Sequence, residues 1–274
     1  MEEQVRQYMR YLEGEEKSMA TRQQYKRDIA RFLLFMGNSP LTRELVISYK
    51  QALQESYLPA TVNVKLAALN GFFSFMERDD LKVKRLRMQN APFCAKEKEL
   101  TRAEYLRLLA AAKRRNNKRL YLLLQAICGT GIRVSELKFI TVQAVRQGEA
   151  IVQLKGKTRV ILIPGKLKKA LREYIRQNSI ASGPVFVTKS GRPLDRSNIW
   201  KMMKALCKEA GVNRSKVFPH NLRHLFARSF YGMEKDIAKL ADILGHSSIN
   251  TTRVYIMSSG SDHRRRLDAL GLVV

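Results

Sequence analysis

The chain has 274 residues, 45% of them apolar, and a formal net charge of +27. This length predicts about two domains of ordinary size. The large positive charge indicates a polyanionic partner and favours nucleic acid over membrane lipid. Residues 1–99 hold 17 basic and 13 acidic side chains, whereas residues 100–274 hold 34 and 11. We therefore expect the second part to make most of the phosphate contacts.

The sequence argues against a secreted or membrane protein. The N-terminus has no apolar signal segment, and no apolar run reaches transmembrane length. The three cysteines, Cys94, Cys128 and Cys207, lie far apart and form no CxxC pair. We therefore predict reduced, mostly buried thiols in a cytoplasmic protein.

Residues 1–88 predict a bundle of helices. Apolar residues recur at helical spacing in Glu2–Leu12, Ser18–Met36, Thr42–Glu55 and, after Pro59, Ala60–Glu77. Basic side chains on the outer faces are candidate contacts to DNA phosphates, namely Arg22, Lys26, Arg27 and Lys65. Taken singly, each of these is more simply explained as an ordinary solvated side chain.

A linker is predicted at residues 89–99. The stretch 79–99 is rich in charge, lacks helical periodicity and contains Pro92. Thr101 and Glu104 then form a capping-box pattern. This pattern predicts the sharp start of a second domain over residues 100–274.

The second domain is predicted to be mainly α with a small antiparallel β-sheet. Helices are expected at Thr101–Arg114, Lys118–Cys128, Ile132–Ile140, Lys166–Gln177 and Asp195–Ala210. The strands Ala150–Leu154 and Arg159–Ile163 flank the turn residues 155–158 and predict a hairpin. A further brief strand is expected at Val185–Val187.

Candidate reactive residues gather in the stretch 218–255. Pro219 suits the first turn of a helix, on which His220 and Arg223, three residues apart, would share one face. A guanidinium is a forked donor for phosphate oxygens, and an imidazole donates hydrogen bonds or moves protons. The helix therefore has the side chains that phosphate chemistry requires.

Two shorter helices are expected to follow. Gly245 reads as the end of a helix at about Lys235–Leu244. Ser248 or Asn250 can cap the next helix, which carries a tyrosine that can act as a covalent nucleophile. Taken singly, each of these polar residues is more simply explained as an ordinary side chain on a helix whose apolar face packs in the core. The joint spacing in a strongly basic chain favours a reactive set made of His220, Arg223, His246 and Tyr255.

An upstream arginine is the expected partner of this set. Arg133 follows the Gly129-Thr130-Gly131 turn and precedes a helix, whose N-terminus favours anions. Glu136, three residues on, can brace Arg133 or an imidazole through a charged hydrogen bond. The simpler alternative is an exposed arginine–glutamate pair on a helix surface, which contributes little.

These motifs resemble those of the tyrosine recombinase (phage integrase) family. The matching segments are Gly-x-Arg-x-x-Glu-Leu at 131–137, His-x-x-Arg at 220–223, Leu-Gly-His at 244–246 and the later Tyr255. The resemblance covers nearly the whole chain. It implies a SAM-like core-binding domain that clamps DNA, followed by a catalytic domain that cuts and rejoins DNA strands without a cofactor or metal.

The resemblance also implies a division of roles. Tyr255 would attack a scissile phosphate and form a 3′-phosphotyrosyl bond. Arg133 and Arg223 would clamp the non-bridging oxygens. Because a free tyrosine has a pKa of about 10, it needs a base or nearby positive charge. His220 is the candidate base, and His246 would hydrogen-bond the phosphate.

A hairpin lysine is expected to protonate the leaving 5′-oxygen, and the turn offers two. The family's common Gly-Lys-Gly pattern is altered in this chain. Alignment on Lys-Gly chooses Lys155, whereas alignment on a short Lys-Thr turn chooses Lys157. We favour Lys157 because it lies nearer the expected tip, and the other lysine would contact phosphate or solvent.

The resemblance further implies a nucleoid-associated homotetramer on double-stranded DNA with inverted-repeat core sites. The tail at about 260–274 has an apolar end that would dock on a neighbouring protomer or fold back on its own domain. His224 is expected to support the site rather than react. Because the chain begins almost at its helical bundle, we expect no additional arm-binding domain.

Two other functions fit the same pattern. One is a DNA-binding regulator that keeps the fold but has lost the chemistry. The other is a relaxing enzyme of the type IB topoisomerase class. Within recombination, integration and excision of a mobile element and resolution of chromosome or plasmid dimers both stay open.

Overall fold

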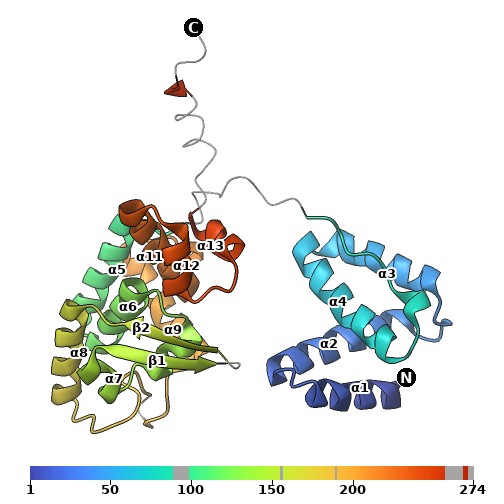
Figure 1. The fold of residues 1–274 in the computed structure, drawn as a ribbon, viewed down its shortest axis with the longest axis horizontal. Coiled ribbons are helices and arrows are strands. Elements are labelled where there is room, and N and C mark those ends of the chain that lie inside the picture. Colours follow the sequence, from blue (N-terminus) through green and yellow to red (C-terminus); the bar gives the residue numbers. More distant parts are fainter. Residues whose placement is uncertain (89–98, 155–156, 189, 257–267, 271–274) are drawn as a thin grey trace. The chain divides into compact units, whose positions relative to one another are not determined.

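A computed structural model gives the fold of the chain and describes residues 1–88, 99–154, 157–188, 190–256 and 268–270. The chain divides into two compact units, Met1–Asn90 and Ala91–Val274 (Figure 1). Each unit has its own apolar core. The predicted linker lies almost wholly outside the described residues.

The described part of the first unit is a bundle of four α-helices: α1 (Glu2–Gly14), α2 (Met19–Met36), α3 (Arg43–Ser56) and α4 (Pro59–Phe75). The side chains of Ser18 and Thr42 cap α2 and α3, and Pro59 occupies the first turn of α4. A short 3₁₀ turn, η1 (Asp79–Leu81), follows. The core is built from side chains at helical spacing, including Ile29, Phe32, Leu66, Leu69, Phe72 and Phe73.

Lys65 corrects one expectation about this bundle. Its side chain is not on an outer face but is 7% exposed, and its ammonium lies 2.7 Å from the carboxylate of Asp28, which is also buried. The ammonium also lies 5.0 Å from the centre of the Tyr57 ring. Since a buried charge requires a partner, Lys65 holds Asp28 in the core and is not available to DNA phosphates.

The second unit begins at the predicted capping box. The Glu104 amide donates to Thr101 Oγ1 over 3.1 Å, and the Thr101 amide donates to Glu104 Oε2 over 2.8 Å. The helices that follow are α5 (Arg102–Arg114), α6 (Lys118–Thr130), α7 (Val142–Gln147), α8 (Gly165–Gln177), α9 (Arg196–Ala205), α10 (Cys207–Ala210), α11 (Pro219–Glu234), α12 (Ile237–Leu244) and α13 (Ile249–Ile256). Short 3₁₀ turns are η3 (Val134–Phe139) and η4 (Arg214–Lys216).

The two strands of the predicted hairpin are present, and the second starts earlier than expected. In the described residues β1 (Glu149–Leu154) and β2 (Lys157–Leu162) form a two-stranded antiparallel sheet. The backbone pairing runs from Glu149 opposite Leu162 to Leu154 opposite Lys157. The second strand therefore starts two residues before the predicted Arg159, because the ladder continues into the stretch read as a turn. The predicted fold class, mainly α with a small antiparallel sheet, is confirmed.

Four further elements differ from the prediction. The stretch 132–140 is a 3₁₀ turn rather than an α-helix, and α7 after it was not anticipated. Residues 185–187 make no named strand, only isolated bridges near them, Thr141 with Pro184 and Val187 with Pro193. The predicted helix 195–210 breaks at Leu206, whose amide bonds the Met203 carbonyl three residues back rather than four.

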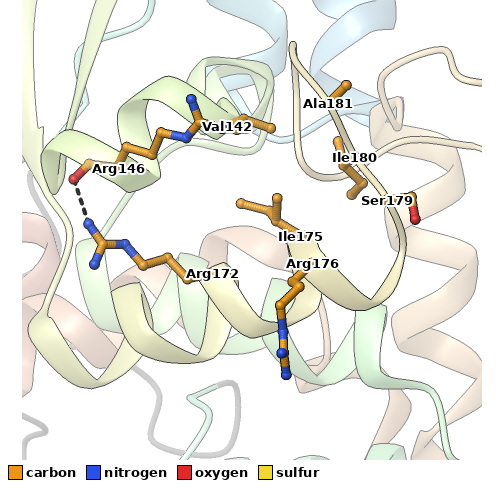
Figure 2. Close-up of a pocket in the computed structure, with 8 residues that line it drawn as sticks. All are labelled: Val142, Arg146, Arg172, Ile175, Arg176, Ser179, Ile180 and Ala181. Carbon is orange, nitrogen blue, oxygen red and sulfur yellow. Dashed lines mark hydrogen bonds between the residues drawn. The ribbon is translucent and has the colours of Figure 1, made fainter.

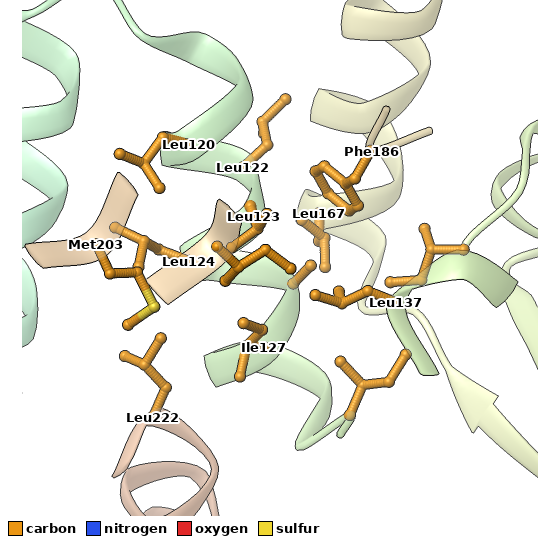
Figure 3. Packing of buried hydrophobic residues seen from close by; sticks show 14 of the residues in the cluster. Leu120, Leu122, Leu123, Leu124, Ile127, Leu137, Leu167, Phe186, Met203 and Leu222 are labelled. Carbon is orange, nitrogen blue, oxygen red and sulfur yellow. The ribbon is translucent and has the colours of Figure 1, made fainter. Parts of the chain in front are cut away.

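Helix α6 lies in the middle of the core of the second unit (Figure 3). Its apolar run is buried, with Leu123, Leu124 and Ile127 fully inaccessible to solvent. Leu137, Met203 and Leu222 pack around it from other elements. The run therefore forms a core helix, and within the described residues no helix is long and apolar enough to cross a membrane.

Candidate active site

Three separated segments and α9 meet at one pocket of about 570 Å³ in the second unit. In Figure 1 the helices α11, α12 and α13 lie together beside α6. The lining comes from the start of η3, from α9, from the start of α11 and from α13. It consists of Ile132, Arg133, Val134, Ser135, Arg196, Trp200, Phe218, Pro219, His220, Arg223 and Tyr255. Four of the residues expected to react therefore border the same space.

The start of α11 is built as the sequence predicts. Pro219 occupies its first turn, and His220 and Arg223 both face the pocket. The next helix, α12, ends as predicted at Gly245, which has a left-handed backbone conformation with φ +62°. The Asn250 amide donates to the Ser248 hydroxyl over 3.3 Å at the start of α13. Of the two predicted caps, Ser248 is therefore the one whose hydroxyl accepts a hydrogen bond from a backbone amide.

Arg223 is buried and held by backbone carbonyls. It is 1% exposed, and its Nη2 donates to the Leu244 carbonyl over 2.7 Å. Its Nη1 donates to the Gly131 carbonyl. Its Nε is buried and has no hydrogen-bond partner among the described residues. Burial, together with the positive charge of Arg133, lowers the pKa of Arg223 to about 10, so the guanidinium stays charged at neutral pH.

Arg133 lines the same pocket from the start of η3. Its Nη2 donates to the Gly245 carbonyl over 3.1 Å, and its Nη1 donates to Glu136 Oε1 over 3.0 Å. The side chain is 39% exposed, so it keeps access to solvent and to a ligand. Arg133 is thus bonded to the glycine that ends α12, and Arg223 is bonded to the glycine two residues before Arg133.

Both of these glycines are required by geometry. Gly131 has φ +64°, and a Cβ on it would lie 2.5 Å from Cδ1 of Phe226. At Gly245 a Cβ would lie 2.4 Å from Cδ of Arg159. Any other residue would be strained by the left-handed backbone and would clash with a neighbouring side chain. The two glycines therefore let the segments approach closely enough to hold the arginines.

Glu136 supports Arg133 as the sequence predicted, but with a second arginine that the sequence analysis missed. Glu136 is 3% exposed, and its carboxylate accepts from Arg133 and from Arg159 of β2. Burial alone would raise the pKa of Glu136, but these hydrogen bonds outweigh it and the pKa lies below its ordinary value. The carboxylate is therefore ionised between two guanidiniums.

Imidazoles surround the phenol of Tyr255, which is 6% exposed. The ring centroid of His224 lies 4.2 Å from that of Tyr255, and the two rings are nearly parallel, with 20° between their planes. The rings of His220 and His246 lie 5.3 and 5.2 Å away. The Arg223 guanidinium carbon lies 5.9 Å from the centre of the Tyr255 ring. The phenol is therefore held among the groups expected to activate it.

These imidazoles are neutral at physiological pH. Burial and the surrounding positive charges lower the pKa of His246 and of His224 to about 4, and they lower the pKa of His220 below its ordinary value as well. His246 Nε2 lies 2.9 Å from Nη2 of Arg223, a group that can only donate. His246 Nδ1 therefore carries the proton and donates to the hydroxyl of Thr252 over 2.9 Å.

Not every predicted site residue has a described side chain. Lys155 lies outside the described residues, and Lys157 begins β2 without a described side chain. The tail residues 260–267 and 271–274, including His263, also lie outside them, as does Cys94. Arg22, Lys26 and Arg27 are in the first unit, where Arg22 pairs with Glu13 over 2.6 Å. In the other direction, Arg196 and Trp200 of α9 line the pocket without having been predicted.

Another pocket, of about 500 Å³, lies between α7 and α8 (Figure 2). Its lining includes Val142, Ile175 and Ile180 and the arginines Arg146, Arg172 and Arg176. Arg172 donates to the Arg146 carbonyl over 2.9 Å. The lining contains no tyrosine, histidine or carboxylate, so this pocket has no counterpart of the candidate nucleophile and base of the first. Across the described residues, no three His, Cys, Asp or Glu side chains are grouped to hold a metal ion.

Comparison with known proteins agrees with this arrangement. Residues 98–261 match the phage integrase family, and residues 5–80 match its N-terminal SAM-like domain. Tyrosine recombinase XerA of Pyrococcus furiosus is 30% identical over 259 residues, which cover 92% of this chain and 88% of that protein. Tyrosine recombinase XerC of Roseiflexus castenholzii is 30% identical over 281 residues, covering 93% and 88%.

Solved structures share the fold. The crystal structure of a XerA recombinase is 26% identical, with a TM-score of 0.56 and coverage of 100% of this chain and 99% of that one. A lambda integrase dimer bound to a COC′ core site is 17% identical, with a TM-score of 0.74 and coverage of 93% and 77%. The resemblance that the motifs indicated is confirmed, and the chain belongs to the phage integrase family.

Proposed function

We propose that the protein is a tyrosine site-specific recombinase that cuts and rejoins double-stranded DNA. The Tyr255 oxygen attacks a phosphodiester, forms a 3′-phosphotyrosyl ester and releases a 5′-hydroxyl. A 5′-hydroxyl of another strand then attacks the ester, restores the DNA backbone and frees Tyr255. Since each step exchanges one phosphate ester for another, the reaction needs no nucleotide to supply energy.

One observation carries the proposal. The guanidiniums of Arg133 and Arg223 border the same pocket as the Tyr255 phenol. Both groups are positively charged, and the buried Nε of Arg223 has no partner among the described residues. The site is therefore short of an anion with oxygen acceptors, which a DNA phosphate supplies. Two fixed guanidiniums would stabilise the charge that develops on its non-bridging oxygens during transfer.

The neighbouring groups fit the remaining steps. His220 is neutral and its ring lies 5.3 Å from that of Tyr255, so it is suited to accept the phenol proton. His246 Nε2 accepts from Arg223 before DNA binds, and we expect a bound phosphate to take over that contact. The other tautomer of His246 can then donate to the phosphate. Lys157, or alternatively Lys155, protonates the leaving 5′-oxygen.

A covalent-capture assay tests the proposal. A nicked DNA substrate from which a short 5′-hydroxyl strand diffuses away traps the protein on DNA. We expect wild-type protein to become covalently attached and Tyr255→Phe to bind the same DNA without attachment. Tyr231→Phe, a hydroxyl deletion in the same unit, is the matched control and should attach normally. Attachment of Tyr255→Phe, or failure of wild type on every DNA that it binds, would refute the proposal.

Site identity and biological role follow from the trapped DNA. Random DNA captured on Tyr255 and sequenced would give the recognised core, which we expect to be an inverted repeat. Supercoil relaxation with no exchanged products would instead identify a relaxing enzyme. A core present once per chromosome would indicate dimer resolution, whereas cores that flank a mobile element would indicate integration and excision.

We also propose that the units divide the binding work on DNA. The first, residues 1–88, clamps the duplex and contacts phosphates through side chains such as Arg22, Lys26 and Arg27, and residues 89–99 link it to the catalytic unit. Relatives of this fold include a lambda integrase dimer on a core site, which supports two protomers on each inverted repeat. Two such sites make a tetramer, with the tail at about 260–274 docked between protomers. Sedimentation of the protein on single and paired sites, with and without that tail, tests this assembly.

A further inference from the structure

A third arginine, Arg159, reaches the site from the hairpin. It lies on β2, where its backbone pairs with Val152, and its side chain is only 13% exposed. One end of its guanidinium donates to the carboxylate of Glu136. Nη1 donates to the Ile243 carbonyl near the end of α12 over 2.8 Å. A single side chain thus joins three segments that are far apart in the sequence.

The stem of Arg159 also lies against the backbone at Gly245. A Cβ at that position would lie 2.4 Å from Cδ of Arg159 and 3.1 Å from its Nε. The next residue, His246, contacts Arg223, and the Gly245 carbonyl accepts from Arg133. Arg159 therefore packs against Gly245, in the segment whose residues contact both catalytic arginines.

We propose that Arg159 is a positioning residue of the recombinase site. It fixes Glu136 and the C-terminal end of α12 at residues 243–245, so that Arg133 is held at the pocket while β2, which starts at Lys157, is tied to the same helix end. Arg159 is absent from the pocket lining and is nearly buried, so it acts through these neighbours and not on DNA. This inference rests on the proposed function, because its test uses DNA cleavage as one readout.

The charges explain why an arginine is needed at this position. The groups that act on the buried Glu136 are Arg159 from β2 and Arg133 from its own segment. Without Arg159, Glu136 would be neutralised by Arg133 alone. The carboxylate would then draw Arg133 away from the pocket, or it would take up a proton more readily. Either change would weaken the hydrogen bonds that Arg133 makes to the DNA phosphate.

The test measures single-turnover covalent attachment to the nicked DNA across pH 5.5–8, together with DNA affinity and thermal stability. We expect Arg159→Met to retain DNA affinity within about threefold and to lose cleavage by about 100-fold, the order of loss that a small misplacement causes. Its loss should deepen towards acidic pH, because Glu136 then gains a proton. A merely structural role would lower the rate by one factor at every pH.

Two further variants keep the test decisive. Arg159→Lys keeps the charge but not the fork that spans Glu136 and Ile243, so it should restore the pH profile while leaving the rate low. Glu136→Gln combined with Arg159→Met should cost no more than the larger single loss, since both changes break one pathway. Arg119→Met is the matched control, because Arg119 is also partly buried and donates to one backbone carbonyl, that of Val187, away from this site.

The outcomes separate this inference from the proposed function. If wild type forms no covalent complex, the function itself fails. If wild type cleaves and Arg159→Met cleaves equally fast, the positioning role is wrong. The role is also wrong if the rate of Arg159→Met falls by the same factor at all pH values, or if its loss simply adds to that of Glu136→Gln.

Discussion

The imidazole of His224 stacks on the phenol of Tyr255, with ring centroids 4.2 Å apart and planes 20° from parallel. His224 follows Arg223 on α11, whereas Tyr255 lies on α13, so the contact fixes one helix against the other at the proposed nucleophile. His224 also contacts the ring of His220, with 4.8 Å between the centroids. His224 thus packs its ring against that of the proposed nucleophile, Tyr255, which agrees with the supporting role predicted for it.

We predict that His224→Ala slows DNA cleavage more than it weakens DNA binding. Loss of the stacked ring removes about 0.5–1.5 kcal/mol of aromatic contact and leaves the phenol free to rotate. His224→Phe keeps a flat ring without a titratable nitrogen and should recover most of the rate. The measurement is single-turnover attachment beside equilibrium DNA binding. A Phe variant as slow as the Ala variant would mean that the imidazole acts chemically.

A second prediction concerns stability and pH. In the folded protein the pKa of His224 and of His246 is about 4, against 6.5 in an unfolded chain. Between those values the unfolded state binds more protons, so the free energy of unfolding must fall as pH is lowered from 6.5 towards 4. Each imidazole contributes at most about 1.4 kcal/mol per pH unit.

Urea unfolding at pH 7, 6 and 5 measures this dependence while most carboxylates stay ionised. His224 is faced by His220, Arg228 and Arg223, all of which disfavour its protonation. His224→Phe removes one titrating group and should flatten the slope. Identical slopes in wild type and His224→Phe would contradict the low pKa of His224.

A third prediction separates the two hairpin lysines. If Lys157 is the acid, Lys157→Ala should reduce cleavage by about 10²–10⁴-fold, the usual contribution of a positioned proton donor. A substrate with sulfur in place of the leaving 5′-oxygen needs no proton and should restore the rate. Lys155→Ala should lose little with either substrate. The reverse pattern would assign the role to Lys155.

The buried Lys65–Asp28 pair gives a fourth prediction, for the first unit. Lys65→Met should lower the free energy of unfolding by about 3–5 kcal/mol, because Asp28 would remain buried without its partner. Lys26→Met is the control, since Lys26 is exposed. It should leave stability unchanged and reduce the salt dependence of DNA binding by about one ion. Chemical unfolding of residues 1–88 within the full chain measures the first effect.

Glycine substitutions give a fifth prediction. Gly245→Ala should destabilise the protein by about 1–2 kcal/mol through its left-handed backbone alone, and further through the clash with Arg159. Cleavage should fall with it, since the Gly245 carbonyl holds Arg133. Gly232→Ala is the matched control on α11, where a Cβ would meet nothing within 4 Å. It should be neutral or slightly stabilising. Equal stability of the two variants would remove the steric argument.

Local signals in the sequence were sufficient to locate most elements. The hydroxyls of Ser18 and Thr42, the prolines Pro59 and Pro219, and the apolar spacing between them place helix starts to within a residue or two. The candidate reactive set could be proposed from the sequence because the spacing of its members is specific when they are taken together. Its members come from separate segments, and their convergence depends on tertiary contacts such as that of Arg223 with Gly131.

What the sequence did not reveal depends on partners distant along the chain. Lys65 occupies a helical position where a long side chain can face either way, and only Asp28, 37 residues earlier, makes the inward position favourable. In the sequence Arg159 has the features of an ordinary strand residue, and only the fold brings its side chain to Glu136 and the Ile243 carbonyl. The start of the second strand was placed two residues late because glycine and lysine in 155–158 suit both a turn and a strand end.

The contacts of Arg133 with Gly245 and of Arg223 with Gly131 have a consequence for synthesis of the protein. Arg133 leaves the ribosome more than a hundred residues before Gly245, and Arg223 arrives long after Gly131. A nascent chain that ends before Gly245 lacks the carbonyl that holds Arg133, and it also lacks the Tyr255 phenol. We therefore expect chains that end before residue 255 to lack the proposed nucleophile, so that the DNA-cutting site is complete only once the stretch through Tyr255 has been translated and folded.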